Sequence, residues 1–453
     1  MIRILLVRFV IILLLYTFGS SVSAQINSSY SRVALGELLN TVGIPQRSMA
    51  GISASYNSLL SNNVGQNLNI LQPASFGDIG FTGVDIGVRY SNVNTNDKIT
   101  GNTFNSSYLI PEFVAIGFPI SNQFKIGGMF GFRQVSTISY NTSSNEYFAA
   151  DSINNIFSGN GGMYQFMVGV GKRFKNFNLG ISTGALFGAK RADLRKQFYG
   201  NSRTAYQTSH SNQELYFSGS FLRLGAQYEL NFKKTVKEKI TNKYSLIFGA
   251  TYEIASRLPA QQSFINSTQI INQFGDYGDL DTASYFKEIG FVNLPQMLSF
   301  GITINKVQTN NFGVFKVFTI GLEYDFTDWS NFKIIDIKQP TLNSNILKLG
   351  GEISPVPNFN NDKISLITYR FGVATGNDYI LINNQSLQRS FATFGLGLPI
   401  RKYRNYENQY SIFNILFEVG NRSSSQLNVS ENYFVLGIGF SVNDIWFIKR
   451  RYD

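Results

Sequence analysis

The sequence of 453 residues contains no cysteine and a single histidine, His210. The lack of cysteine excludes disulfide bonds, thiolate metal sites and cysteine nucleophiles. A single histidine argues against a multi-histidine zinc site and against a histidine-dependent catalytic triad. We therefore expect no metal or other cofactor, and no enzymatic activity.

Charged residues are also scarce, at 15% of the chain against about a quarter in an average domain. Aromatic residues make up another 15%, and there are 41 glycines. This composition favours β-sheet over a helix bundle. The formal net charge of +11 is spread along the chain rather than gathered in one stripe, so we expect no nucleic-acid partner.

Long apolar runs are missing after the N-terminus. Residues 1–24 combine Arg3 and Arg8 with an apolar run to Tyr16 and a small-residue site at 22–24. This pattern predicts a secretory signal peptide; the alternative, a membrane anchor helix, would need a longer run. No later stretch reaches about 18 consecutive apolar residues. An exported chain of this kind is either a soluble protein or a transmembrane β-barrel.

Fourteen stretches after residue 75 alternate bulky apolar residues with small or polar ones, which predicts β-strands. Most are long enough to cross a bilayer, since a tilted strand needs about 9–11 residues to do so. The expected strands are 79–91, 108–120, 122–134, 162–173, 175–187, 214–230, 242–253, 296–308, 314–326, 345–354, 363–374, 388–400, 409–421 and 431–442.

The stretch YFVLGIGF, residues 433–440, illustrates the two faces of these strands. Phe434, Leu436 and Ile438 alternate with the smaller Val435 and Gly437. We expect the bulky face to meet lipid and the small or polar face to line a lumen. Because an open sheet edge would leave backbone groups unpaired in lipid, the sheet must close. Residues 76–442 are thus predicted to form an all-β, 14-stranded antiparallel transmembrane β-barrel.

The connections between these strands alternate in length. They are long after odd-numbered strands and short after most even-numbered ones, as external loops and periplasmic turns are in outer-membrane barrels. We expect Tyr90, Tyr108, Tyr324 and Tyr433, near strand ends, to form interfacial aromatic girdles. This pattern predicts a location in the outer membrane of a Gram-negative bacterium, in contact with its lipid.

Two segments flank the predicted barrel. Residues 25–75 lack sustained alternation, and we expect them to form a plug in the lumen, because a fourteen-stranded barrel has room for one. The alternative is an unstructured periplasmic leader. Residues 443–453 end in the basic sequence KRRYD, and we interpret them as a periplasmic tail that is either a docking element or a solvated end.

Charged residues on the predicted inward face are the main candidates for a site. They could hold a carboxylate head group, or pair with one another and with the plug. By the alternation they are Asp85, Arg89, Lys125, Arg133, Arg173, Glu323, Asp325, Lys348, Glu352, Arg370 and Glu418.

Short motifs resemble the outer-membrane long-chain fatty-acid channel family of the FadL/TodX type. In NLPQMLSFGITINKV (293–307), Leu294 and Pro295 match a Leu-Pro pair that opens a strand in that family. In FTIGLEYDFTDWSNF (318–332), a Trp-Ser pair matches the end of the next strand. In QPAS (72–75), Pro73 and Ala74 match the end of the N-terminal hatch, although Gln72 replaces an asparagine. The opening SYSRVALGELLNTVG and the ending WFIKRRYD are similar to Bacteroidota members of this superfamily.

The resemblance implies a plugged fourteen-stranded barrel through which hydrophobic compounds pass, with Pro73, Ala74, Leu294 and Pro295 along the plug or ligand pathway. The first hypothesis is therefore a passive channel for hydrophobic small molecules such as long-chain fatty acids. The alternative is a non-transporting structural subunit of an outer-membrane complex for protein secretion or barrel assembly. The basic tail and the basic turn at 231–243 favour this alternative, in which the partners are other proteins of the complex.

Overall fold

A computed structural model provides the three-dimensional structure of the chain. The expected signal peptide and most of the expected C-terminal tail lie outside the residues that the structure describes. The described residues are 28–57, 66–99, 101–148, 151–199, 206–237, 240–271, 276–311, 313–356, 367–402, 410–424 and 427–444.

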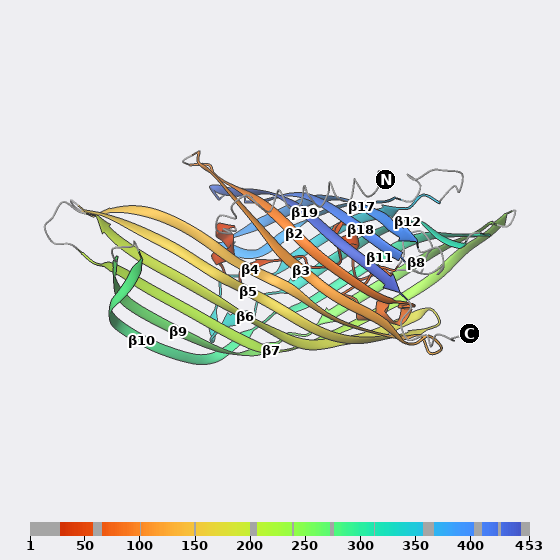
Figure 1. Ribbon diagram of the computed structural model, residues 1–453, viewed down its shortest axis with the longest axis horizontal. Coiled ribbons are helices and arrows are strands. Elements are labelled where there is room, and N and C mark those ends of the chain that lie inside the picture. The colour runs from red at the N-terminus through yellow and green to blue at the C-terminus, as the bar shows by residue number, and fades with distance from the viewer. Residues whose placement is uncertain are drawn as a thin grey trace.

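Fourteen long antiparallel strands form one closed ring (Figure 1). Each strand pairs with its neighbours around the ring, and the last pairs with the first. In ring order they are β2 (Thr82–Asp97), β3 (Thr103–Ser121), β4 (Ile126–Phe148), β5 (Asp151–Phe174), β6 (Phe177–Tyr199), β7 (Thr208–Lys237), β8 (Ile240–Glu253), β11 (Gln296–Asn310), β12 (Gly313–Asp328), β15 (Ser344–Ile353), β16 (Thr368–Ile382), β17 (Gln385–Lys402), β18 (Tyr410–Ser423) and β19 (Val429–Asp444).

The ring closes where β19 pairs with β2, from Val429 opposite Asp97 to Asp444 opposite Thr82. The predicted 14-stranded antiparallel barrel is confirmed. We call the end at which β2 begins and β19 finishes the terminal end, and the opposite end the extended end. Two hairpins are inserted at the extended end: β9 (Arg257–Ile271) with β10 (Tyr277–Asn293), and β13 (Lys333–Ile334) with β14 (Ile337–Lys338).

The two faces of the strands differ as the alternation predicts. On β2, Ile86 and Val88 are 42% and 37% exposed, whereas Asp85 and Arg89, which flank this pair, are buried. Outward aromatic and aliphatic side chains such as Phe166, Phe248 and Leu322 continue this belt around the ring. A belt of this kind is the surface that transmembrane barrels present to lipid. No helix in the described part of the chain is long and apolar enough to span a membrane.

The strands continue well beyond the predicted ends at the extended end. The segments predicted as long external loops are mostly strand: β4 and β5, for example, pair continuously up to Phe148 opposite Asp151. That prediction is wrong because these Ser-, Asn- and Thr-rich segments face no lipid and so carry no apolar alternation, while their backbones still pair. Together β4, β5, β6, β7, β9 and β10 form a curved sheet beyond the ring (Figure 1).

The described residues before β2 lie against the inner faces of the strands. They include the 3₁₀ helix η1 (Ser29–Arg32), strand β1 (Glu37–Leu38), the short helix α2 (Ile44–Arg47) and the 3₁₀ helix η2 (Pro73–Asp78). Strand β1 pairs with β4, and η2 packs against β5 and β6. We call residues 28–57 and 66–79 the inner segment. It begins near the start of β19, where Tyr30 donates to the Val429 carbonyl at 3.0 Å, and it ends at the terminal end.

Candidate functional site inside the barrel

Inward glycines make room for the inner segment. A Cβ atom at Gly180 or Gly171 would overlap the backbone of Pro73, and one at Gly249 would overlap the Ala54 carbonyl. Only glycine allows backbone to approach a strand so closely. The predicted pathway residues Pro73 and Ala74 therefore lie in the lumen near the terminal end, packed against strand backbone.

Arg47, at the end of α2, is the centre of a fully buried ion cluster. Its guanidinium forms ion pairs with Glu112 of β3 and, at 2.9 Å, with Glu418 of β18. Glu112 also lies 3.9 Å from Arg89. Desolvation alone would lower the pKa of Arg47, but the two carboxylates outweigh it and hold that pKa above its usual value. The cluster fixes the helix between two strands on opposite sides of the barrel closure.

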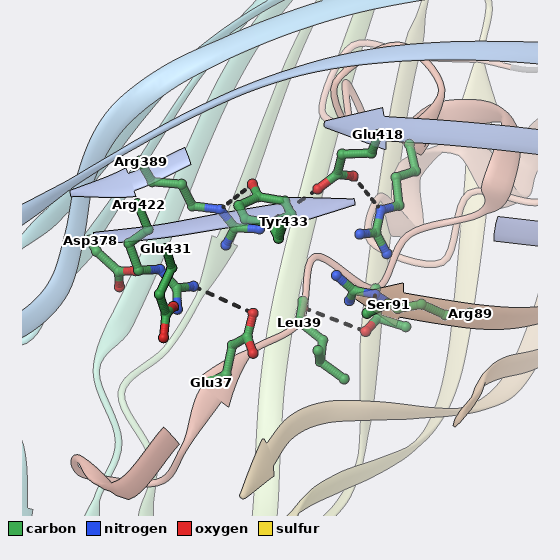
Figure 2. A network of polar contacts seen from close by, with 12 residues as sticks. Glu37, Leu39, Arg89, Ser91, Asp378, Arg389, Glu418, Arg422, Glu431 and Tyr433 are labelled. Atoms are coloured by element: carbon green, nitrogen blue, oxygen red, sulfur yellow. Dashed lines mark hydrogen bonds and ion pairs between the residues drawn. The ribbon is translucent and has the colours of Figure 1, made fainter. Parts of the chain in front are cut away.

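A second cluster lies toward the extended end (Figure 2). Arg422 forms ion pairs with Asp378 at 2.9 Å, with Glu37 of β1 at 3.4 Å and with Glu431 at 3.5 Å. Ser28 donates to the other Glu431 oxygen at 2.5 Å. Three carboxylates around one guanidinium thus join the inner segment to β16, β18 and β19.

A third cluster joins the inner segment to β12 and β15. Lys348 pairs with Glu323 at 3.0 Å and with Asp325 at 2.5 Å, and it donates to the Gly51 carbonyl at 3.1 Å. Glu323 accepts the backbone N–H groups of Ser53 and Ala54 at 2.7 and 2.6 Å. Because these hydrogen bonds are made to backbone atoms, they hold residues 51–54 in place independently of the side chains at these positions.

The remaining predicted inward charges are also paired. Glu352 lies between Lys316 at 2.9 Å and Arg370 at 2.6 Å. Asp85 accepts the Leu68 N–H at 2.9 Å, and Arg173 pairs with Asp78 of η2 at 2.7 Å and with Glu229.

Two residues differ from this pattern of buried ion pairs. Arg133 bonds the Gln165 side chain at 2.6 Å and the Thr41 carbonyl at 3.1 Å instead of a carboxylate. Lys125 was expected on the inward face, but it is exposed in the β3–β4 turn with a positive φ of 53°. The prediction fails there because β4 begins four residues later than expected.

The two predicted pathway motifs lie at opposite ends of the barrel. Leu294 and Pro295 connect β10 to β11 at the extended end, and the Leu294 N–H donates to the Ser256 carbonyl at 2.7 Å. Pro73 and Ala74 lie toward the terminal end. The structure therefore does not bring these two motifs together into one site.

Sequence reasoning missed several inward groups, and Glu112 shows why. The β2–β3 register shifts between Gly87 and Val88, which leaves Glu112 in a bulge, so that Glu112 and Phe113 are both buried. Strict alternation cannot anticipate an inserted residue. Two of the four expected girdle tyrosines also face inward: Tyr108 is buried, and Tyr433 accepts from Arg389 at 3.1 Å.

An apolar layer closes the extended end of the lumen. Trp329 stacks on Tyr379, with ring centroids 4.3 Å apart, and meets Phe332 edge-on at 5.0 Å. Tyr30 and Leu387 belong to the same buried cluster. All five side chains are 6% exposed or less, so this layer is a packed core.

Two cavities in the barrel combine charged and apolar lining residues. One of about 150 Å³ lies among Arg133, Arg223, Glu253, Asp325 and Lys348. Another, of about 390 Å³, opens at the terminal end beside Asp78, Lys125 and Arg173. Sites for drug-sized apolar ligands are mostly apolar and measure about 300–1,000 Å³. The inner cavity, at about 150 Å³, is smaller than this range.

His210 lies on β7, in the curved sheet beyond the ring, away from the buried ion clusters. Its Nε2 is 2.9 Å from Asp193, and its Nδ1 is 3.4 Å from the Ser267 hydroxyl, which donates to Asp279 at 2.9 Å. The Ser267 hydroxyl therefore donates its proton to Asp279 and not to the imidazole of His210. No group of three or more metal-ligating side chains occurs among the described residues.

Comparison with known proteins identifies the family. A family model described as BamG matches residues 1–453. The chain belongs to the BamG family. No curated protein matches this BamG-family chain.

Solved structures similar to this BamG-family barrel include hydrocarbon channels. A FadL homologue of Pseudomonas aeruginosa is 12% identical, with a TM-score of 0.55 over 90% of this chain and 99% of its own. The Pseudomonas putida toluene transporter TodX is 13% identical, with a TM-score of 0.52 over 90% and 99%. The Ralstonia pickettii toluene transporter TbuX is 12% identical, with a TM-score of 0.51 over 89% and 99%. At these identities the likeness establishes the fold, so the expected resemblance to the FadL/TodX type is confirmed for the fold.

Proposed function

We propose that this BamG-family protein is a sealed outer-membrane barrel that serves as a structural subunit of a complex for protein secretion or barrel assembly, in a Gram-negative bacterium of the Bacteroidota type. The single observation that carries the proposal is the way in which the inner segment is fastened inside the lumen. Buried ion clusters fasten the inner segment to β3, β12, β15 and β18, and an apolar core closes the extended end.

Opening a path through this lumen would separate several buried ion pairs at once. Breaking one buried pair costs about 3–5 kcal/mol when a charge is left without its partner. The open state would therefore be rarely populated unless the ligand supplied contacts that replace those of the ion clusters. A barrel of this kind is better suited to hold partner proteins in the membrane than to pass a solute.

A channel for hydrophobic small molecules, such as long-chain fatty acids, is the second candidate. The observation in its favour is the likeness in fold to channels for hydrophobic compounds over nearly their whole length. In that case the inner segment must move, and the ligand must replace contacts that the ion clusters now make.

A disulfide lock distinguishes the two functions. The Cβ atom of Ser55 lies 3.2 Å from the position of a Cβ at Gly301, close to the spacing of about 3.5–4.5 Å in disulfides. The chain has no other cysteine. We expect the oxidised Ser55→Cys/Gly301→Cys variant to retain its partners and the normal levels of other outer-membrane proteins. A loss of oleate or toluene uptake on oxidation that is restored by dithiothreitol would favour the channel; each single-cysteine variant is the control.

A further inference from the structure

Strand β10 has one unpaired edge. Along one side, Tyr277–Asn293 pairs with Ile271–Arg257 of β9. On the other side, β13 pairs only with Val292 and Asn293, and the Ile335 N–H donates to the Phe291 carbonyl at 2.9 Å. No strand among the described residues pairs with this edge between positions 277 and 290. Its backbone donors and acceptors form a template for another strand.

This edge is only partly protected in the way that exposed edges usually are, by two register irregularities near its tip and by Lys287 and Glu288. Register irregularities occur at Asp279/Asp281 and Thr282/Ser284, near the tip. From Ser284 to Asn293 the pairing is regular, with no proline or bulge to block a further strand. Tyr285, Phe286 and Ile289 in this stretch are 61%, 47% and 81% exposed. Natural edge strands rarely combine length, regularity and exposed apolar side chains.

An open groove lies on the face of the same sheet, over β5, β6, β7 and β9, and reaches β10 at Ile289. Its volume is about 670 Å³, and its lining includes Phe187, Tyr216, Pro259 and Ile289. Tyr216, Gln261 and Ile289 are directly opposite one another across β7, β9 and β10. In strand addition, backbone hydrogen bonds provide affinity and such side-chain pockets provide specificity.

The charges of β10 indicate what pairs with it. The strand carries Asp279, Asp281 and Glu288 against Lys287, a net charge of 1 − 3 = −2, within a chain of formal charge +11. Antiparallel pairing of Ser284–Gly290 with the same stretch of a second copy would place Lys287 opposite Lys287, and like charges opposite each other are destabilising. A lipid acyl chain offers no hydrogen bonds to the open edge.

We propose that the β10 edge, Ser284–Gly290, binds an extended strand of a different subunit, with apolar residues beside Tyr285 and Ile289 and basic residues toward Asp279 and Asp281. This inference rests on the proposed function and specifies its contact surface at the extended end. The free part of β4 near its tip is a natural comparison, since its sequence NTSSN (141–145) has no apolar residue.

The test uses the complex extracted from native membranes in mild detergent. We expect the Tyr285→Lys/Ile289→Lys variant to recover at least tenfold less of the partner than the wild type, with the barrel itself present in normal amount. The control is Tyr147→Lys on β4, where the side chain is 83% exposed; it should retain the partner. Amide hydrogen exchange over 284–290 should be slower in the complex than in the isolated chain, with no change over 141–148.

The outcomes separate the two proposals. If wild-type extracts contain a stoichiometric partner that the lysine variant also retains, and β10 exchange is unchanged, the edge inference is wrong and the subunit function stands. If wild-type extracts contain no partner, the proposed function fails, and this inference fails with it. Protection of β10 by a second copy of the chain would overturn the assignment to a different subunit.

Discussion

At the residue scale, inward glycines and inward charged side chains contribute to the packing of the lumen in different ways. Glycine on the inner face brings strand backbone against the inner segment, and buried ion pairs then hold that segment in position. Alternation in the sequence identifies most of these residues, because side chains on a strand alternate between two faces. It cannot identify their partners: nothing in the sequence relates Arg47 to Glu418, which is 371 positions away.

Adjacent glycines on β15 provide a matched test of this packing. A Cβ at inward Gly350 would lie 2.5 Å from the Met49 carbonyl oxygen, whereas at outward Gly351 the nearest atom would be 3.2 Å away. Overpacking costs about 1–3 kcal/mol, so Gly350→Ala should lower the free energy of unfolding by that amount. Gly351→Ala should change it much less. Equal effects in denaturant unfolding of the two purified variants would refute the close approach of the inner segment.

The Arg47→Ala substitution tests how much the ion clusters contribute to the free energy of unfolding. Arg47→Ala leaves buried Glu112 and Glu418 only the more distant Arg89 and Arg389, at 3.9 and 3.8 Å, and we expect a loss of up to about 3–5 kcal/mol. Arg191→Ala is the control, because its pair with Glu214 at 3.3 Å is half-exposed and such pairs contribute at most about 1 kcal/mol. Unfolding in denaturant measures both, and a similar small loss for the two variants would mean that Arg47 does not fasten the inner segment.

At the element scale, the ring and the curved sheet beyond it differ in whether their strands face lipid. The ring strands face lipid, and their alternation made all fourteen predictable from the sequence. The strand extensions and the β9–β10 hairpin face no lipid and lack this signal. For this reason the sequence predicts a loop of 42 residues between the expected strands 242–253 and 296–308. In the structure, β9 and β10 pair over most of that length.

The inner segment can be tested as an element. We expect the full-length protein to show no stable ion conductance in planar bilayers, because ion clusters and an apolar core fill its lumen. A variant that lacks residues 28–57 should show measurable conductance, since those residues supply Arg47, the backbone bound by Glu323 and Tyr30 of the apolar layer. Large steady conductance by the full-length protein would contradict a sealed lumen.

At the scale of the whole molecule, fold and function have to be argued separately. The sequence predicts a barrel with the architecture of hydrocarbon channels, and the structure confirms that architecture. The sequence does not reveal how the lumen is filled, because this depends on contacts between residues hundreds of positions apart. A plug in the lumen fits either function, and the ion clusters that fasten it are the observation that favours the proposed subunit.

The most direct test of the central claim is extraction of the full-length protein from native membranes in mild detergent, followed by mass spectrometry of co-purifying proteins and bound apolar molecules. The sealed-subunit account predicts a fixed set of partner proteins in stoichiometric amounts and no enriched hydrophobic ligand. A barrel recovered alone that carries fatty acid or another apolar compound would contradict it.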